Sequence, residues 1–112
     1  MKNSIFPQKK YILDEDKIFY IPELENHTYT SEELLIRNDI VRISKGYTWD
    51  GCTIVKDYNE TYVASLLHDI LYKHKFKREL ADKIFLIQME IDKFKYAKIY
   101  YYGVRLFGWI FY

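Results

Sequence analysis

The chain contains a single cysteine among its 112 residues, which excludes an intrachain disulfide and fits a reducing compartment. Residues 1–7 lack the apolar region of a secretory signal peptide, so we expect no export by that route. Long apolar runs are missing too. The aromatic tail, residues 96–112, is short and contains Lys98 and Arg105, so we expect no transmembrane segment. The formal net charge of +1 is too small for the broad basic face of a dedicated nucleic-acid binder.

Apolar and aromatic residues, in contrast, are abundant. Hydrophobic residues make up 49% of the sequence and aromatic residues 19%, with no low-complexity segment, which favours a folded chain. The length suits one modest core, so we predict a single domain over residues 1–112. Strand and turn patterns occupy about residues 9–56 and helical patterns about residues 57–110. We therefore predict an α+β fold in which a small antiparallel N-terminal sheet packs against three C-terminal helices.

The N-terminal half predicts short strands. Residues 10–13 and 17–21 flank the acidic residues 14–16, which is typical of a hairpin. Residues 40–43 alternate as a third strand. Residues 34–36 fit either a short strand or a helical turn.

The C-terminal half predicts three helices. Asp57 followed by Glu60 is a capping-box pattern, so we expect the first helix to run from there to about residue 73. The second helix covers roughly residues 77–92, and the third begins near residue 94. The expected apolar stripes are Leu80, Ile84, Ile87 and Ile91 in the second helix and Ala97, Tyr101, Val104 and Gly108 in the third, with Lys98 and Arg105 on a more exposed side.

Residues 64–72 are the most informative segment, because they are apolar or small except for His68, Asp69 and Tyr72. On a helix, His68 and Tyr72 lie one turn apart on one face, and Asp69 points about 100° away. A helix that is apolar all round is normally buried, and a buried imidazole or carboxylate without partners is costly. These side chains therefore need partners from the rest of the fold, or they have a chemical role.

Asp82 is the best-placed partner for His68, because Asp69 diverges from His68 on the helix. Asp82 shares a stripe with Phe85 and Met89, so we expect it to be half buried. Tyr72 can donate its hydroxyl to the same carboxylate, and Asp69 is then left to bind a cation. Asp82 can instead simply pair with Arg78, Lys83 or Arg105.

Residues 46–53 form a turn-rich loop whose carbonyls suit a hard cation such as calcium. In this interpretation the loop and Asp69 hold the metal while His68 activates water, and Asp50 lies beside them as a further candidate. Two other interpretations remain. Cys52 is a nucleophile with His68, or more simply an inert packed thiol. The His-Asp-Tyr group can also be purely structural.

Four ordered motifs carry a family resemblance: Gly46 to Thr53, His68 to Tyr72, Ala81 to Phe85 and Val104 to Trp109. Over about residues 39–110 the chain resembles an uncharacterised phage and prophage family, domain of unknown function 1353. Val55 stands where members tend to have a proline. The resemblance implies a phage or mobile-element origin, so we expect the protein in the cytoplasm of a bacterial host or in the virion.

The segment from His68 to Tyr72 is also similar to the catalytic helix of phospholipases A2, and the stretch from Ala81 to Phe85 is closest to the viral form. This resemblance implies that His68 is the base that activates water, that Asp69 binds calcium, and that Tyr72 and Asp82 orient His68. It also implies that Tyr47, Trp49 and Gly51 supply the loop carbonyls for the metal. Trp49 stands where that family has its middle glycine.

Two classes of function follow. The first is a phage-encoded, metal-dependent esterase or lipid hydrolase, with His68, Asp82 and Tyr72 as its catalytic group and calcium as the candidate metal. The second is a non-catalytic phage protein, either a virion component or an inhibitor or binder of a host factor, in which the same network is structural. The partner we expect is a lipid, or a host or phage protein.

Overall fold

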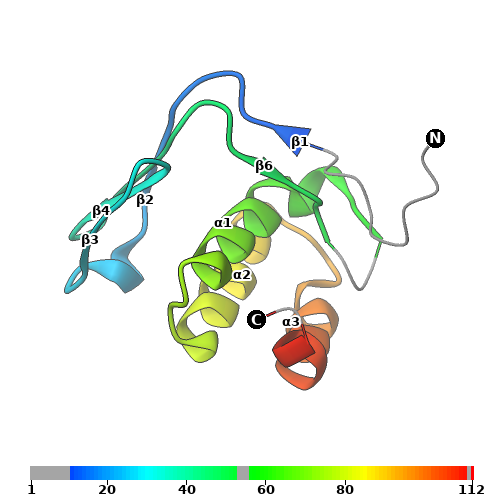
Figure 1. Ribbon diagram of the computed structural model, residues 1–112. Coiled ribbons are helices and arrows are strands. Elements are labelled where there is room, and N and C mark those ends of the chain that lie inside the picture. Colours follow the sequence, from blue (N-terminus) through cyan, green and yellow to red (C-terminus); the bar gives the residue numbers. More distant parts are fainter. Residues whose placement is uncertain (1–10, 53–55, 111) are drawn as a thin grey trace. The chain divides into compact units, whose positions relative to one another are not determined.

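The computed structural model describes residues 11–52, 56–110 and 112 of the chain. The chain divides into two compact units, Met1–Asp50 and Gly51–Tyr112 (Figure 1). Strands make up the first unit and the longer helices the second, so the predicted α+β class is confirmed. The division falls shortly before residue 57, where the sequence pattern changes.

The described part of the N-terminal unit, residues 11–50, contains six short strands. In chain order they are β1 (Tyr11–Ile12), β2 (Lys17–Tyr20), β3 (Thr28–Thr30), β4 (Leu34–Arg37), β5 (Ile40–Ile43) and β6 (Thr48–Trp49). All pairings are antiparallel: β1 pairs with β6, and a four-stranded sheet has the order β2-β5-β4-β3. A 3₁₀ turn, η1 (Pro22–Leu24), follows β2.

The core of this unit lies on one face of the four-stranded sheet. Leu34 pairs with Ile43 and Ile36 with Val41, and all of these side chains are buried. Alternate residues of a strand point to opposite faces, so both cross-strand pairs contribute to one apolar layer. Residues 34–36, which the sequence left undecided, are therefore strand. The turn to β5 is made by Asn38, whose φ of +58° is a left-handed value that asparagine tolerates.

The predicted hairpin around residues 14–16 is wrong. β1 pairs with β6 and β2 with β5, so the two strands belong to different sheets. Residues 13–17 instead connect to the segment before β6. The Leu13 amide donates to the Tyr47 carbonyl at 2.9 Å, and the Lys45 amide donates to Asp16 Oδ1 at 2.7 Å. Asp16 thus serves a long-range contact, which a local turn pattern does not reveal.

In the C-terminal unit, the described residues form three α-helices, α1 (Tyr62–Lys73), α2 (Arg78–Ile91) and α3 (Ala97–Phe107). Short 3₁₀ turns, η2 (Asn59–Thr61) and η3 (Gly108–Ile110), precede α1 and follow α3. Among the described residues, no helix is long and apolar enough to cross a bilayer. The helices meet in an apolar cluster of Ala64, Phe85, Met89, Phe94, Ala97 and Tyr100.

The start of α1 differs from the predicted capping box. The Thr61 hydroxyl accepts a hydrogen bond from the Tyr58 amide at 3.0 Å and donates to the Tyr58 carbonyl at 2.9 Å. Asp57 accepts a hydrogen bond from the Cys52 amide at 2.6 Å instead. The helix therefore begins a few residues later than predicted, after a 3₁₀ turn.

α1 and α2 both end in Schellman motifs with a lysine in the left-handed position. Lys75 and Lys93 each have φ of +62°. The Phe76 amide donates to the Leu71 carbonyl, and the Phe94 amide donates in the same way to the Met89 carbonyl. The helix boundaries were predicted to within a few residues, although neither end contains the glycine that usually marks this motif.

Two surface predictions are wrong. Ile91, predicted on a buried stripe of α2, is exposed, because it is the last residue of the helix. Arg105, predicted on an exposed side of α3, donates to Asp82 at 2.8 Å and is partly buried. Of the predicted α3 stripe, Ala97 and Gly108 are buried and Tyr101 and Val104 only partly so, and Tyr100 takes a place in the core.

Candidate active site

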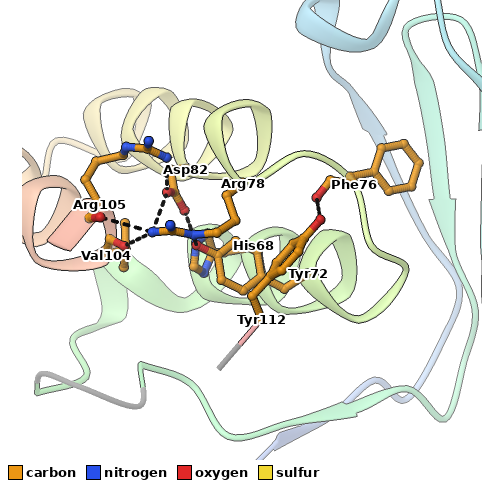
Figure 2. A network of polar contacts seen from close by, with 8 residues as sticks. All are labelled: His68, Tyr72, Phe76, Arg78, Asp82, Val104, Arg105 and Tyr112. Carbon is orange, nitrogen blue, oxygen red and sulfur yellow. Dashed lines mark hydrogen bonds and ion pairs between the residues drawn. The ribbon is translucent and has the colours of Figure 1, made fainter. Parts of the chain in front are cut away.

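Asp82 is the centre of a polar network in the C-terminal unit (Figure 2). Its side chain is fully buried, not half buried as predicted. Oδ1 lies 2.6 Å from His68 Nε2 and accepts a hydrogen bond from the Tyr72 hydroxyl, also at 2.6 Å. Oδ2 accepts one from Arg105 Nη1 at 2.8 Å, and Arg78 Nη2 lies 3.8 Å away. The predicted grouping of His68, Tyr72 and Asp82 is therefore present in the structure.

The helices place these side chains for simple geometric reasons. His68 and Tyr72 are one turn apart on α1, and their ring centroids are 4.1 Å apart. The His68 ring also lies 4.7 Å from the Phe85 ring on α2, one turn after Asp82. The aromatic contacts fix the plane of the imidazole, and Asp82 then meets its edge.

Asp82 is held as a carboxylate. Burial alone raises its pKa, but the hydrogen bonds from His68 and Tyr72, the charge of His68 in its protonated form and the hydrogen bond from Arg105 outweigh burial, so the pKa lies below the ordinary 3.8. Burial and the hydrogen bond to Asp82 raise the pKa of Tyr72 to about 12, although the hydrogen bond from Arg78 lowers it. Tyr72 is therefore a neutral donor at physiological pH. The hydrogen bond to Asp82 also raises the pKa of Arg105.

An ionised Asp82 determines which nitrogen of His68 can react. A carboxylate only accepts hydrogen bonds, so Nε2 must carry the proton that points at Oδ1. Neutral imidazole with the proton on Nε2 has its lone pair on Nδ1. His68 Nδ1 has no hydrogen-bond partner among the described residues, and the side chain is 15% exposed. The arrangement can therefore accept a proton at Nδ1 from water or from a substrate.

Arg78 ties the network to α3. Its Nη2 donates to the Val104 carbonyl at 2.8 Å and to the Arg105 carbonyl at 3.0 Å, in the last turn of α3. The Val104 carbonyl also accepts the Gly108 amide, and a cation at this end of the helix suits the helix dipole. Arg78 Nε donates to the Tyr72 hydroxyl at 3.3 Å. One guanidinium therefore links α1, α2 and α3 around Asp82.

Gly108 is required by this close approach. A Cβ built at Gly108 would lie 2.5 Å from the Tyr72 hydroxyl and 3.2 Å from Arg78 Nη2. Gly103, one helical turn and a residue earlier, has nothing within 4 Å of the same position. The absence of a side chain at Gly108 therefore lets the end of α3 lie close to Tyr72 and Arg78, whereas Gly103 makes no such close approach.

Tyr112 packs on the other side of Tyr72. The two rings meet edge to face with centroids 5.1 Å apart, and the Tyr112 hydroxyl donates to the Phe76 carbonyl at 2.7 Å. Lys75 Nζ donates to the Tyr112 carbonyl oxygen. Tyr112 therefore connects the turn between α1 and α2 to the Tyr72 side of the network.

The predicted metal ligands fit calcium only in part. Asp69 is half-buried on α1, next to His68, and supplies a hard carboxylate. Tyr47 and Trp49 lie in the N-terminal unit, where the Tyr47 carbonyl accepts from Leu13 and the buried Trp49 belongs to β6 rather than to an open loop. Among the residues that the structure describes, no group of three or more His, Cys, Asp or Glu side chains could hold a metal. We therefore derive no chemical step through a metal ion.

Gly51 and Asp50, the remaining candidates, are adjacent in sequence but fall in different units. Gly51 has φ of +83°, and a Cβ there would lie 2.5 Å from Asp57 Oδ2, so this glycine is needed for the turn over the Asp57 carboxylate. Asp50 is half-buried at the end of the N-terminal unit. The predicted position of Asp50 beside His68 stays a prediction.

Sequence reasoning missed the part played by Arg78, Arg105 and Gly108. Both arginines were considered as simple partners of Asp82, and the spacing of four between Arg78 and Asp82 was the available signal. It gave no indication that Arg78 also caps α3. Gly108 has an ordinary helical backbone, so nothing local marks it as necessary.

One surface hollow lies away from this chemistry. It has a volume of about 420 Å³ and is lined by Asn59, Glu60, Tyr62, Val63 and Asp92 near the start of α1. None of the side chains bound to Asp82 lines it. The hollow therefore provides no substrate pocket for His68.

Fold and site together define a small α+β protein with a buried carboxylate that orients a partly exposed histidine. The model of the family called "Protein of unknown function (DUF1353)" matches residues 24–104, most of the chain, and the chain belongs to this family. No curated protein and no solved structure matches the chain. The resemblance to domain of unknown function 1353 is therefore confirmed as membership of that family.

Proposed function

We propose that this protein hydrolyses carboxylic esters of lipids, with His68 as the general base. The observation that carries the proposal is the 2.6 Å contact between His68 Nε2 and Asp82 Oδ1, which leaves Nδ1 to accept a proton. The substrate class comes from the similarity of the segment from His68 to Tyr72 to phospholipase A2. A phage or prophage origin, and a location in the host cytoplasm or the virion, stay predictions from the first resemblance.

The proposed step is hydrolysis by an activated water. His68 Nδ1 removes a proton from water while the water oxygen attacks the ester carbonyl. The carbon–oxygen bond to the alcohol then breaks, and His68 returns the proton to the departing alkoxide, so that acid and alcohol leave and the imidazole is neutral again. Asp82 stays ionised throughout and stabilises the imidazolium, as the aspartate of a catalytic triad does. Tyr72 and Arg105 hold Asp82 in place.

The test is turnover of a panel of fluorescent phospholipids by the full chain, with calcium and then with a chelator. His68→Ala should lower the rate about 10²–10⁴-fold, because the positioned base is lost. Cys52→Ser should change little, because the nucleophile is water rather than sulfur. His74→Ala, at the end of the same helix, is the matched histidine control. Full activity in His68→Ala, or its loss in Cys52→Ser alone, contradicts the assignment of the base.

Asp69→Asn tests the calcium requirement separately. If Asp69 binds calcium, the neutral amide should weaken calcium binding in calorimetry and lower activity together, because a hard cation prefers a carboxylate. Equal activity with calcium and with chelator, for both the wild type and Asp69→Asn, leaves His68 as the base and removes the metal from the proposal.

A second candidate is a non-catalytic phage protein that binds a host or phage protein or forms part of the virion. The observation that favours it is the saturation of Asp82 by His68, Tyr72 and Arg105, with Arg78 close by. A carboxylate bonded this completely is also a sound structural device for joining three helices. A correctly folded wild type with no turnover under any divalent metal supports this candidate.

A further inference from the structure

The outward face of α3 is apolar. Ile99, Tyr102 and Leu106 follow helical spacing and lie on one face, and they are 67%, 61% and 66% exposed. Trp109 and Ile110 extend the face into η3, and both are also exposed. We call these five residues the α3 face. An amphipathic surface helix normally turns charged or polar residues toward solvent, so contiguous exposed apolar side chains mark an interaction site.

This face is presented by a helix that is firmly held. The opposite side of α3 is in the core through Ala97 and Tyr100, and the Tyr100 hydroxyl donates to the Lys56 carbonyl at 2.8 Å. Arg78 fixes the last turn of α3, and Arg105 joins α3 to Asp82. Rotating the α3 face inward would break all of these contacts. Its exposure is therefore a stable property of the C-terminal unit.

The segment of the chain that carries the α3 face contains basic residues and no acidic ones. Residues 93–112 contain Lys93, Lys95, Lys98 and Arg105, and no aspartate or glutamate. The three lysines are exposed, whereas Arg105 is paired with Asp82. The remaining residues contain 13 of the 17 basic and all 16 acidic residues. Positive charge is thus concentrated on the segment that also exposes large apolar and aromatic side chains.

We infer that the α3 face binds an anionic lipid surface. Apolar side chains enter the boundary between headgroups and acyl chains, tryptophan and tyrosine favour that boundary, and lysines meet the anionic headgroups. A second copy of the chain is a poorer occupant, because a symmetric contact would bring the same cations of both copies together. The inference rests on the proposed function for lipid as the substrate, and it adds how the protein reaches that substrate.

The test is binding of the full chain to vesicles made of equal parts phosphatidylglycerol and phosphatidylcholine, measured by co-sedimentation. Pure phosphatidylcholine vesicles are the charge control. Ile99→Gln/Leu106→Gln should weaken binding about tenfold or more, because both side chains lose apolar burial in the bilayer. Ile91→Gln is the matched control, since Ile91 is 64% exposed at the end of α2 and outside the α3 face. Trp109 emission should shift to shorter wavelength on binding, and Trp109→Phe should abolish that shift.

Each outcome of these experiments either supports or overturns the inference. Binding that needs phosphatidylglycerol, weakens with added salt and is lost only in the α3 variant supports it. Equal binding by wild type and Ile99→Gln/Leu106→Gln overturns it, and so does no binding to either vesicle. Self-association that the α3 variant abolishes, without vesicle binding, also overturns it and identifies a protein interface. If His68→Ala binds vesicles but does not turn over substrate, the inference of lipid binding by the α3 face stands, and catalysis is judged from the turnover assay. If the wild type turns over a short-chain ester but does not bind vesicles, the proposed catalysis stands and the inference of lipid binding is wrong.

Discussion

The Asp82 network and the α3 face contradict the usual placement of polar and apolar residues in opposite ways. The network buries a charged carboxylate completely, and the α3 face exposes large apolar side chains. Arg105 belongs to the same helix as most of that face, and it donates to Asp82. One short helix therefore supplies a charged group to the interior and apolar groups to the surface.

The two regions differ in whether the chain itself compensates for the unusual placement. Asp82 has hydrogen-bond donors from His68, Tyr72 and Arg105, so its burial is balanced within the fold. The apolar side chains of the α3 face remain exposed, and among the described residues nothing balances that exposure. A satisfied buried group can be structural or catalytic, whereas an exposed apolar face points to a partner.

Removing the carboxylate should have the largest effect on stability. Asp82→Ala leaves the buried Tyr72 and the partly buried His68 and Arg105 donors without their acceptor, and we expect a loss of ~2–4 kcal/mol in the free energy of unfolding. The measurement is chemical denaturation followed by circular dichroism. Glu90→Ala, an exposed carboxylate on the same helix, is the control and should change little. Equal stability of Asp82→Ala and wild type would show that the network holds nothing together.

Gly103 in α3 and Gly108 at the start of η3 should respond in opposite directions. Gly108→Ala places a methyl group against the Tyr72 hydroxyl, and overpacking of this kind costs about 1–3 kcal/mol. Gly103→Ala meets open space in the helix interior and should stabilise by up to about 1 kcal/mol. Thermal unfolding of both variants measures the difference. A Gly108→Ala variant as stable as Gly103→Ala would mean that α3 does not approach Tyr72 closely in solution.

The sequence predicted the grouping of His68, Tyr72 and Asp82 because their constraints are local. Helical spacing puts His68 and Tyr72 on one face, and the apolar neighbours of Asp82 indicate that its carboxylate is buried. The α+β class followed from the change of periodicity near residue 57 for the same reason. These signals need no knowledge of the tertiary fold.

The failures involve contacts between residues far apart in sequence. The pairing of β1 with β6 depends on segments more than thirty residues apart, so the adjacent acidic turn suggested a false hairpin. Arg105 faces Asp82 only because α3 crosses near α2, which no periodicity within α3 reveals. The helix ends at Lys75 and Lys93 use lysine in a left-handed position, where the usual glycine signal is absent.

Acid should weaken the network in a defined direction. The pKa of Asp82 is lower in the folded state than its ordinary 3.8, so Asp82 stabilises the fold fully above that ordinary value. The contribution then declines as the pH falls through the lowered folded pKa, because protonation removes the charge that His68 and Arg105 meet. The difference in unfolding free energy between wild type and Asp82→Asn should therefore shrink below about pH 4. A difference that stays constant down to acid pH would contradict the lowered pKa.

The smallest predicted effect on stability comes from removing the Tyr72 hydroxyl while keeping its ring. Tyr72→Phe removes one hydrogen bond to Asp82, whose carboxylate keeps His68 and Arg105, so we expect a loss of about 1 kcal/mol.

The same change removes the oxygen that a Cβ at Gly108 would approach to 2.5 Å, after which the nearest remaining atom is Arg78 Nη2 at 3.2 Å. Tyr72→Phe/Gly108→Ala should therefore be more stable than the sum of its single variants predicts, by about 0.5 kcal/mol or more. A double-mutant cycle in denaturant measures this coupling, with Tyr72→Phe/Gly103→Ala as the uncoupled control. Additivity in both cycles would show that α3 moves away from Tyr72 instead of repacking around it, and the link between the buried network and the α3 face would then be loose.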